Sequence, residues 1–204
     1  MSLNSSPTDG NENDLLNTIQ AKIDLKTSEI IVPDTRSQDQ LRSKGYGEME
    51  NKRFILMSYE ALYLSHIAKL VLLYKSAEMK FEELLRYALK KDSDIFTKFL
   101  IYRDLRSRGY TVKEGFGFGI DFRVYERGEY GKKSAKFVVF GINEGTSIST
   151  SDLAKKIFQI EKMGKDGIIA VIERRGEVIY YKLNQIRFHE NKNNSNNNSN
   201  KEEK

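Results

Sequence analysis

The sequence of 204 residues contains no cysteine and no tryptophan, and only two prolines and two histidines. The absence of cysteine excludes a disulfide framework, a thiolate zinc site and a cysteine nucleophile. Two histidines, His66 and His189, argue against a multi-histidine metal site. No apolar run approaches the roughly 18–20 residues that a membrane-spanning helix needs. The polar, acidic residues 1–13 are not typical of a signal peptide. We therefore expect a soluble, cytoplasmic protein.

Aromatic and charged side chains are plentiful. Eleven tyrosines and eleven phenylalanines supply large apolar groups for a core, although the mean hydropathy is only −0.58. Residues 1–94 carry 13 basic and 15 acidic side chains, whereas residues 95–189 carry 18 basic and 11 acidic ones. This asymmetry predicts two modules, the second facing a polyanion such as a nucleic acid. The alternative is an ordinary lysine-rich surface.

Hydrophobic periodicity predicts an α+β domain over residues 15–92. Residues 18–25 alternate between apolar and polar and are followed by a second apolar segment at 29–32, which indicates a β-hairpin. Ser58 is a suitable N-cap for a helix over 59–70. The remaining expected elements are a helix over 34–44, a strand over 54–57 and a helix over 80–90. The polar residues 1–14 and the Asn-rich residues 190–204 are expected to be disordered.

Residues 93–189 have a different pattern. An amphipathic helix is expected over 93–107 and a second over 150–163. The expected strands lie at 110–112, 118–125, 136–142, 167–172 and 178–183. A helix, three strands, a helix and two strands predict a compact three-layer α/β domain, so the fold class of the chain is α/β.

Two features of this second domain suggest sites that the surrounding sequence does not support. Gly115, Gly117 and Gly119 resemble a phosphate loop, but no lysine follows them and no helix begins there. Asp121 is a candidate metal ligand, but metal-dependent nucleases of similar shape need a later Glu-x-Lys triplet on a neighbouring strand. The triplet at residues 78–80 lies upstream, which argues against a metal mechanism.

Several motifs follow one another in a specific order. Residues 102–110 form a helix end with a basic last turn and Gly-Tyr, and residues 117–125 read Gly-Phe-Gly-Ile-Asp-Phe-Arg-Val-Tyr. They are followed by segments at 136–139, 149–154 and 168–172, and by Tyr180-Tyr181. With these motifs the chain resembles the catalytic domain of the archaeal tRNA-splicing endonucleases (tRNA-intron lyases). The segments 41–47 and 59–64 resemble the N-terminal domain of the same family.

The resemblance implies cleavage of precursor tRNA at bulge-helix-bulge sites without a metal or cofactor, giving 2′,3′-cyclic phosphate and 5′-hydroxyl ends. In the family a Tyr is the general base, a His the general acid and a Lys the cation that stabilises the transition state. Tyr125 matches the base and Lys165 the cation. The acid position, three residues before the Phe137-Val-Val strand, is Ser134.

The serine changes the expected role of the chain. A hydroxyl of such high pKa cannot usefully protonate a leaving alkoxide near pH 7, and loss of a general acid removes on the order of 10²–10⁴-fold of rate. The chain therefore resembles the structural, non-catalytic subunit of a heteromeric enzyme. Its expected partners are precursor tRNA and a catalytic subunit, in an α2β2 assembly.

Two alternatives remain open. One is a weakly catalytic subunit with a degenerate triad, in which water or Lys133 replaces the histidine. The other is a stand-alone basic RNA-binding module. Purely structural roles are the alternative for two triad-equivalent residues: Tyr125 would pack at the end of a strand, and Lys165 would lie in a solvated turn.

Two surfaces are expected to carry the function. Basic residues near the degenerate site are expected to contact tRNA phosphates without reading sequence, unless they form only a solvated face. They are Arg103, Arg106, Arg108, Arg123, Arg127, Lys132, Lys133 and Lys136. The last strand leaves an apolar edge that proteins normally cover or pair, so it is expected to form a subunit interface, unless the tail shields it. The interface residues are Val178, Ile179, Tyr180, Tyr181 and Leu183.

Overall fold

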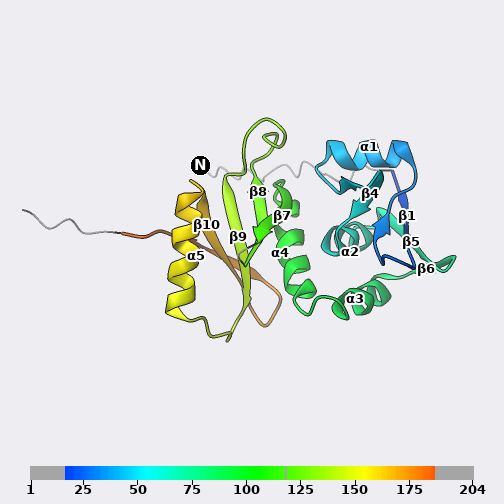
Figure 1. Ribbon diagram of the computed structural model, residues 1–204. Coiled ribbons are helices and arrows are strands. Elements are labelled where there is room, and N and C mark those ends of the chain that lie inside the picture. The colour runs from blue at the N-terminus through cyan, green and yellow to red at the C-terminus, as the bar shows by residue number, and fades with distance from the viewer. Residues whose placement is uncertain (1–16, 118, 187–204) are drawn as a thin grey trace, which may run out of the picture.

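A computed structural model describes residues 17–117 and 119–186. Phe118, His189 and both of the termini that were predicted to be disordered lie outside the described residues. The chain forms two sheets, with helix α4 (Ile95–Ser107) between them (Figure 1). The strand order is β3-β4-β2-β1-β5-β6 in the first sheet and β11-β10-β9-β8-β7 in the second. The architecture confirms the predicted α/β class, with an α+β unit followed by a three-layer α/β unit.

The first sheet begins with the predicted hairpin. Its strands are β1 (Ile19–Ile23), β2 (Ile30–Ile31), β3 (Glu48–Glu50), β4 (Arg53–Leu56), β5 (Leu70–Tyr74) and β6 (Ala77–Met79). The helices are α1 (Thr35–Ser43), α2 (Ser58–His66) and α3 (Phe81–Leu89). The side chain of Asp34 caps α1 by accepting a hydrogen bond from the Ser37 N–H at 2.7 Å.

The helix predicted over residues 59–70 is shorter, and its predicted N-cap is wrong. The N-cap is Met57, whose N–H donates to the Glu60 carboxylate at 2.9 Å. The helix ends at His66, and Ala68 turns the chain with a φ of 55°. The following apolar run becomes β5, which pairs in parallel with β1. A short apolar run fits a buried strand as well as a helix, and pairing with β1 decides between them.

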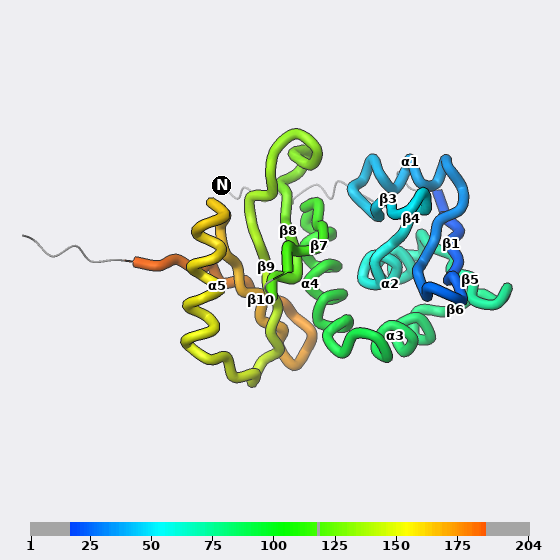
Figure 2. The backbone as a smooth tube through the Cα atoms, in the orientation of Figure 1, coloured from blue at the N-terminus to red at the C-terminus, as the bar shows by residue number. Residues whose placement is uncertain are grey.

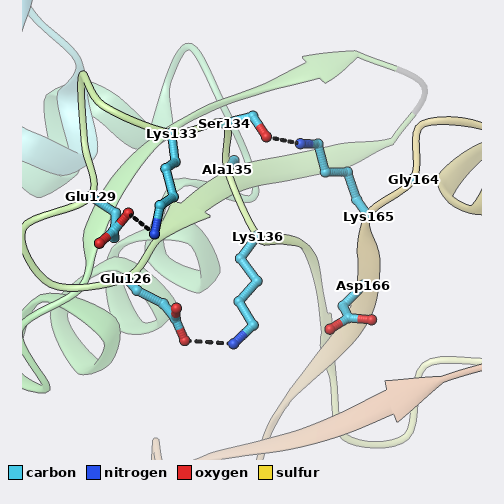
Figure 3. A pocket seen from close by; sticks show the side chains of 9 residues that line it. All are labelled: Glu126, Glu129, Lys133, Ser134, Ala135, Lys136, Gly164, Lys165 and Asp166. Atoms are coloured by element: carbon cyan, nitrogen blue, oxygen red, sulfur yellow. Dashed lines mark hydrogen bonds and ion pairs between the residues drawn. The ribbon is translucent and has the colours of Figure 1, made fainter.

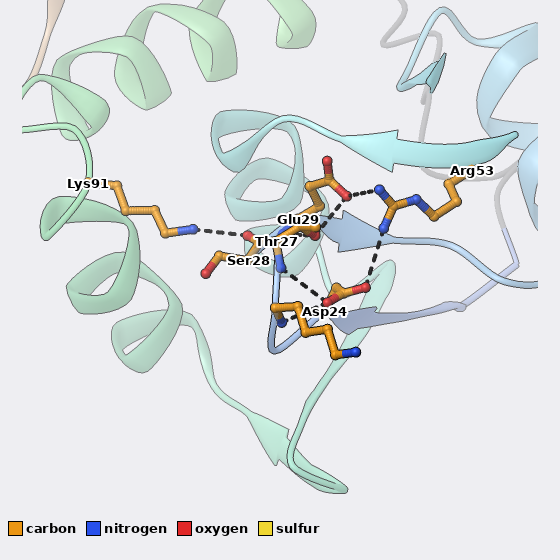
Figure 4. A network of polar contacts seen from close by, with 7 residues as sticks. Asp24, Thr27, Ser28, Glu29, Arg53 and Lys91 are labelled. Atoms are coloured by element: carbon orange, nitrogen blue, oxygen red, sulfur yellow. Dashed lines mark hydrogen bonds and ion pairs between the residues drawn. The ribbon is translucent and has the colours of Figure 1, made fainter. Parts of the chain in front are cut away.

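A polar network fixes the turn between β1 and β2 (Figure 4). Arg53 on β4 forms ion pairs with Asp24 at 3.3 Å and with Glu29 at 2.8 Å. Lys91, between α3 and α4, donates to the carbonyl oxygen of Ser28 at 2.9 Å. The network therefore ties the hairpin both to its own sheet and to the segment that leads into α4.

The second sheet has α4 on one face and α5 (Thr150–Lys162) on the other. Its strands are β7 (Thr111–Gly117), β8 (Ile120–Tyr125), β9 (Phe137–Asn143), β10 (Asp166–Ile172) and β11 (Val178–Leu183). Phe122 and Val139 pair across β8 and β9 and join the core on the α4 side, whereas Val138 and Phe140 pack with Ile160 of α5.

The glycine-rich segment closes the hairpin between β7 and β8. The register shifts between Glu114 and Gly117, and a Cβ on Gly115 would collide with the carbonyl oxygen of Ile120. Glycine is therefore needed for close backbone approach in a bulged hairpin, and the segment does not lead into a helix as a phosphate loop would.

One hydrophobic core runs through both units. Tyr59 and Tyr63 of α2 contact Tyr102 of α4, with ring centroids 4.9 and 5.7 Å apart. Tyr59 also packs edge-on against Phe122 of β8 at 5.1 Å. Aromatic pairs of this kind contribute stability beyond the apolar area that they bury, and here they hold α2 against the second sheet.

A buried charge lies at this junction. Glu60 is 1% exposed, and its carboxylate accepts hydrogen bonds from the N–H groups of Gly47 and Met57. Burial raises the pKa of Glu60, and the positive charges of Lys113 and Arg106 oppose that rise. Lys113 is itself buried and donates to the carbonyl oxygen of Gly47 at 2.9 Å.

Arg106 was expected on the basic surface, and that expectation is wrong. The residue is 1% exposed, and its guanidinium lies 4.1 Å from the ring centroid of Tyr46. It also donates to the carbonyl oxygen of Tyr110 at 3.3 Å. The inner face of α4 carries it into the junction, so it is not available to RNA phosphates.

Asp121 bonds to the neighbouring strand. Its Oδ2 accepts a hydrogen bond from the N–H of Gly141 on β9 at 2.7 Å. A Cβ on Gly141 would collide with Ile101 of α4, so glycine lets the helix approach the sheet. In the described part of the chain, no group of three or more His, Asp or Glu side chains is placed to hold a metal ion.

We expect Glu60→Ala to lower the free energy of unfolding by about 3–5 kcal/mol, because it removes the buried negative charge that faces Lys113 and Arg106 and leaves two N–H groups without their acceptor. Urea denaturation at pH 7 measures the loss. The matched control is Glu82→Ala, at an exposed position in α3, which should change the value by less than about 0.5 kcal/mol. A loss at residue 60 no larger than in the control would contradict the prediction.

A second prediction concerns pH. Burial raises the pKa of Asp121, against the Gly141 bond and the charges of Lys98 and Lys156. The folded state therefore holds this proton to higher pH than the unfolded chain, and stability falls as pH rises from about 3.8 through the folded-state pKa. Asp121→Asn keeps an acceptor for Gly141 and removes that fall. We expect the variant to gain stability over the wild type at pH 7, and the gain to vanish near pH 3 in urea titrations. An equal effect at both pH values would refute this account.

Candidate active site

Neighbouring strands bring the three triad-equivalent positions to one edge of the second sheet. β8 ends at Tyr125, and β9, antiparallel to it, begins at Phe137. β9 and β10 are parallel, with Phe137 opposite Asp166 at the start of β10. Ser134, in the loop before β9, and Lys165, just before β10, therefore converge near the end of β8. Figure 2 shows the β8–β9 loop projecting from this edge.

Ser134 and Lys165 are in direct contact (Figure 3). The Nζ of Lys165 donates a hydrogen bond to the Oγ of Ser134 at 2.7 Å. Both residues line a pocket of about 350 Å³. The charged residues that share this pocket are Glu126, Glu129, Lys133, Lys136 and Asp166.

The end of α5 sets the position of Lys165. The helix ends at Lys162, and Gly164 follows with a φ of 61°. Its N–H donates to the carbonyl oxygen of Glu161 at 2.9 Å. A left-handed glycine is a common way to end a helix, and here it turns the chain directly into β10.

Tyr125 lies at the same edge, but its ring packs elsewhere. It is half-buried, and its ring meets that of Tyr130 edge-on, with centroids 5.1 Å apart. It is not among the residues that line the Ser134 pocket. The structure thus joins the acid and cation positions directly and places the base position beside them.

No described histidine occupies this site. His66 ends α2, where its ring contacts Phe81 and Phe99 at 5.9 and 5.8 Å. His189 lies outside the described residues. At the position that the sequence assigns to the general acid, the contacting group is therefore the Ser134 hydroxyl.

Acidic side chains balance the lysines of the pocket, which the sequence analysis missed. Lys133 pairs with Glu129 at 2.8 Å, and Lys136 pairs with Glu126 at 2.6 Å. A hydrogen bond from each lysine to its glutamate raises the pKa of both lysines. A local turn, in which the N–H of Lys133 donates to the carbonyl oxygen of Glu129 at 2.9 Å, creates the first pair, whereas the second needs the whole folded β8–β9 loop. The pocket is of mixed charge and not uniformly basic.

The other predicted RNA-binding residues lie outside this pocket. Arg123 donates from Nε to the carbonyl oxygen of Glu114 at 2.6 Å. Arg127 lies against Gly109, where an added Cβ would be 2.5 Å from a guanidinium nitrogen. Lys132 is exposed.

Arg103 of α4 and Arg108, the C-cap residue of that helix, are also engaged within the chain. Arg103 lies 5.7 Å from the ring centroid of Phe99. Arg108 is paired with Asp104 at 2.8 Å. Only Arg108 of these two is exposed, so α4 contributes less basic surface than its sequence predicts.

The predicted interface strand, β11, is an edge strand whose neighbour in the sheet is β10. The N–H of Glu173 donates to the carbonyl oxygen of Glu177 at 2.9 Å, so these two residues form a hydrogen-bonded pair of the antiparallel ladder. Because hydrogen-bonded and non-hydrogen-bonded pairs alternate, Ile179 and Tyr181 direct their main-chain groups toward β10. The main-chain groups that face the open edge belong to Val178, Tyr180 and Lys182.

The side chains of β11 divide between the two faces of the sheet. Tyr180 donates its hydroxyl proton to Asp104 of α4 at 2.8 Å, and burial raises its pKa. Ile179 and Tyr181 project on the other face and are 37% and 52% exposed. Leu183, on the same face, is half-buried. The edge therefore presents an apolar strip beside its open main-chain groups.

None of the helices described in residues 17–117 and 119–186 combines the length and the apolar character needed to cross a membrane.

Comparison with known proteins agrees with this architecture. Residues 21–85 match the family model of the tRNA intron endonuclease N-terminal domain, and residues 95–180 match that of the catalytic C-terminal domain. The tRNA-splicing endonuclease of Methanococcus vannielii is 34% identical over 174 residues, covering 83% of this chain and 96% of that protein. That of Thermococcus onnurineus is 34% identical over 151 residues, or 74% and 87% of the two chains. That of Pyrococcus furiosus is 33% identical over 146 residues, or 72% and 84%. The chain belongs to the tRNA-splicing endonuclease family.

Proposed function

We propose that this chain is the structural, non-catalytic subunit of a tRNA-splicing endonuclease. It assembles with a catalytic subunit, as an α2β2 complex, and the complex cuts introns from precursor tRNA at bulge-helix-bulge sites. The products are 2′,3′-cyclic phosphate and 5′-hydroxyl ends. Support comes from the family membership combined with the chemistry of the Ser134 position.

The contact between Ser134 and Lys165 carries the proposal. In the proposed reaction the 2′-oxygen attacks phosphorus, a base takes its proton, and the bond from phosphorus to the 5′-oxygen breaks. The leaving 5′-oxygen needs a proton from a general acid. At 2.7 Å from the Lys165 ammonium, the Ser134 hydroxyl accepts a hydrogen bond. Its own pKa lies too far above 7 for it to act as that acid.

Lys133 is a poor substitute for the missing acid. It lines the same pocket, but its ammonium is paired with Glu129 at 2.8 Å. That hydrogen bond raises the pKa of Lys133 and makes proton release at neutral pH less favourable. This observation favours the structural subunit over a weakly catalytic one.

The basic residues of this region are proposed to contact phosphates of the bound tRNA. The set is Arg123, Arg127, Lys132, Lys133 and Lys136. Since Lys133 and Lys136 already hold glutamate partners, their contribution is smaller than their charges suggest. Such contacts position the RNA without reading its sequence.

The first test is cleavage of a bulge-helix-bulge RNA by the purified chain and by a mixture with its catalytic subunit. We expect no cleavage by the chain alone, because it lacks a general acid, and full cleavage by the mixture. Denaturing electrophoresis resolves the products. Metal-independent cleavage by the chain alone would overturn the proposal.

Substitutions in the assembled complex provide the control. Tyr125→Phe or Lys165→Ala in this chain should leave the rate within about twofold. Replacing the general-base tyrosine of the catalytic subunit should abolish cleavage, as expected for a proton-transfer group. A large loss from either substitution in this chain, with the complex still assembled, would favour the weakly catalytic alternative.

The β11 edge is proposed as the contact with the catalytic subunit, through Val178, Ile179, Tyr180, Tyr181 and Leu183. An edge strand with open N–H and C=O groups can add a strand from a partner, and the exposed apolar strip would be buried at the same time.

We expect Lys182→Pro to prevent assembly while the fold is kept. The N–H of Lys182 faces the open edge, so proline removes a donor there and spares the ladder to β10. Lys182→Thr is the matched control, because it also removes the ion pair with Asp166 but keeps the N–H. Size-exclusion chromatography with light scattering distinguishes complex from free chains, and circular dichroism checks the fold. Co-elution of the proline variant as intact complex would place the interface elsewhere.

A further inference from the structure

Phe116 and Arg123 form a stacked pair on the surface of the β7–β8 hairpin. The Phe116 side chain is 48% exposed, and the Arg123 guanidinium carbon lies 4.6 Å from its ring centroid. A hydrogen bond from Arg123 Nε to the carbonyl oxygen of Glu114, at 2.6 Å, holds the guanidinium in place. A single exposed phenylalanine needs no explanation, but here a guanidinium lies over the ring and is itself held by a main-chain hydrogen bond, so the two side chains form an ordered surface.

The pair shares strand β8 with one triad-equivalent position, Tyr125, although Phe116 lies at the β7–β8 hairpin, toward the opposite end of that strand. Arg123 and Tyr125 are two residues apart on β8, so their side chains project from the same face, roughly 7 Å apart along the strand. That face is opposite the one on which Phe122 and Val124 join the core with α4. Helix α5 packs on β10, and its Lys156 donates a hydrogen bond to the carbonyl oxygen of Gly119, in the β7–β8 turn, at 2.9 Å (Figure 1).

The chemistry of the pair suits an unpaired nucleobase. Bases of single-stranded RNA segments stack on aromatic rings and on guanidinium planes, whereas bases within a duplex are already stacked. The pocket beside Ser134 holds equal numbers of acidic and basic side chains, so its electrostatic attraction for RNA phosphates is weak. A stacking contact would supply positioning that the charges do not.

We propose that Phe116 and Arg123 form a stacking platform for an unpaired base of RNA bound along β8. The inference rests on the proposed function in so far as the ligand is a bulged precursor-tRNA segment. It adds a base-stacking contact to the phosphate contacts proposed for Arg123.

The test measures binding of the full chain to two RNAs by fluorescence anisotropy. One is a bulge-helix-bulge RNA made uncleavable by 2′-deoxy substitution at the cleaved positions, and the other is its fully paired counterpart. We expect the wild type to prefer the bulged RNA, and Phe116→Ala to weaken binding of that RNA by roughly 10-fold, as for loss of one stacked base. Binding of the paired RNA should be unchanged.

A second exposed phenylalanine provides the matched control. Phe158 on α5 is 47% exposed, and Lys162 Nζ lies 4.5 Å from its ring centroid. Phe158→Ala should change binding of either RNA by less than twofold. Phe116→Trp should restore binding, because the larger ring keeps the stacking surface.

Salt dependence and a fluorescent base separate stacking from charge. Arg123→Lys keeps the charge but loses the guanidinium plane, so it should weaken binding of the bulged RNA without changing the slope of log affinity against log salt. 2-Aminopurine placed at successive bulge positions should be quenched at one of them by the wild type and not by Phe116→Ala.

Two results would overturn the platform: no preference of the wild type for the bulged RNA, or equal effects of Phe116→Ala and Phe158→Ala on folded protein. Either result leaves the structural-subunit proposal to the separate test of cleavage by the mixture. Failure of that cleavage test, with the stacking results as expected, would leave an RNA-binding platform on a chain of another role.

Discussion

The buried carboxylate of Glu60 is the constraint on which the arrangement of the two units depends. Its oxygens hold the N–H groups of Gly47 and Met57, and it lies in the field of Lys113 and Arg106 from the second unit. A charge that is 1% exposed persists only where such donors surround it, so helix α2, the loop before β3, helix α4 and strand β7 are held in one relative position.

Packing contacts connect this arrangement of the two units to the candidate site. The loop that carries Gly47 also carries Gly45, which lies so close to Thr111 and Tyr130 that a Cβ would collide with the Thr111 side chain. The ring of Tyr130 in turn packs edge-on against Tyr125. Through these contacts the first unit supports the end of β8. The triad-equivalent positions therefore lie on a framework that both units hold in place, with the Ser134 hydroxyl bonded to Lys165 at two of them.

The surfaces around that framework fit a subunit that positions other molecules. The pocket beside Ser134 is charge-balanced, the edge of β11 is open, and an aromatic–guanidinium pair is fixed along β8. Each of these features offers contact, orientation or pairing to a bound molecule. The division of labour proposed for the enzyme follows from this combination.

The sequence by itself determined the elements whose pattern is local. Alternation predicted the β1–β2 hairpin, a glycine and a basic turn predicted the end of α4, and the resemblance placed Ser134 at the position of the acid. Only the tertiary structure decided features that depend on residues distant in the chain. Leu70–Tyr74 became a strand because β1 was beside it, and Arg106 was buried because α4 turns that face into the junction. Glu126 neutralises Lys136 because the β8–β9 loop brings them together. The alternation of hydrogen-bonded pairs between β10 and β11 decides which main-chain groups of β11 face the open edge. Periodicity records which face of an element is apolar, but the partner of that face is chosen by packing and pairing across the whole fold.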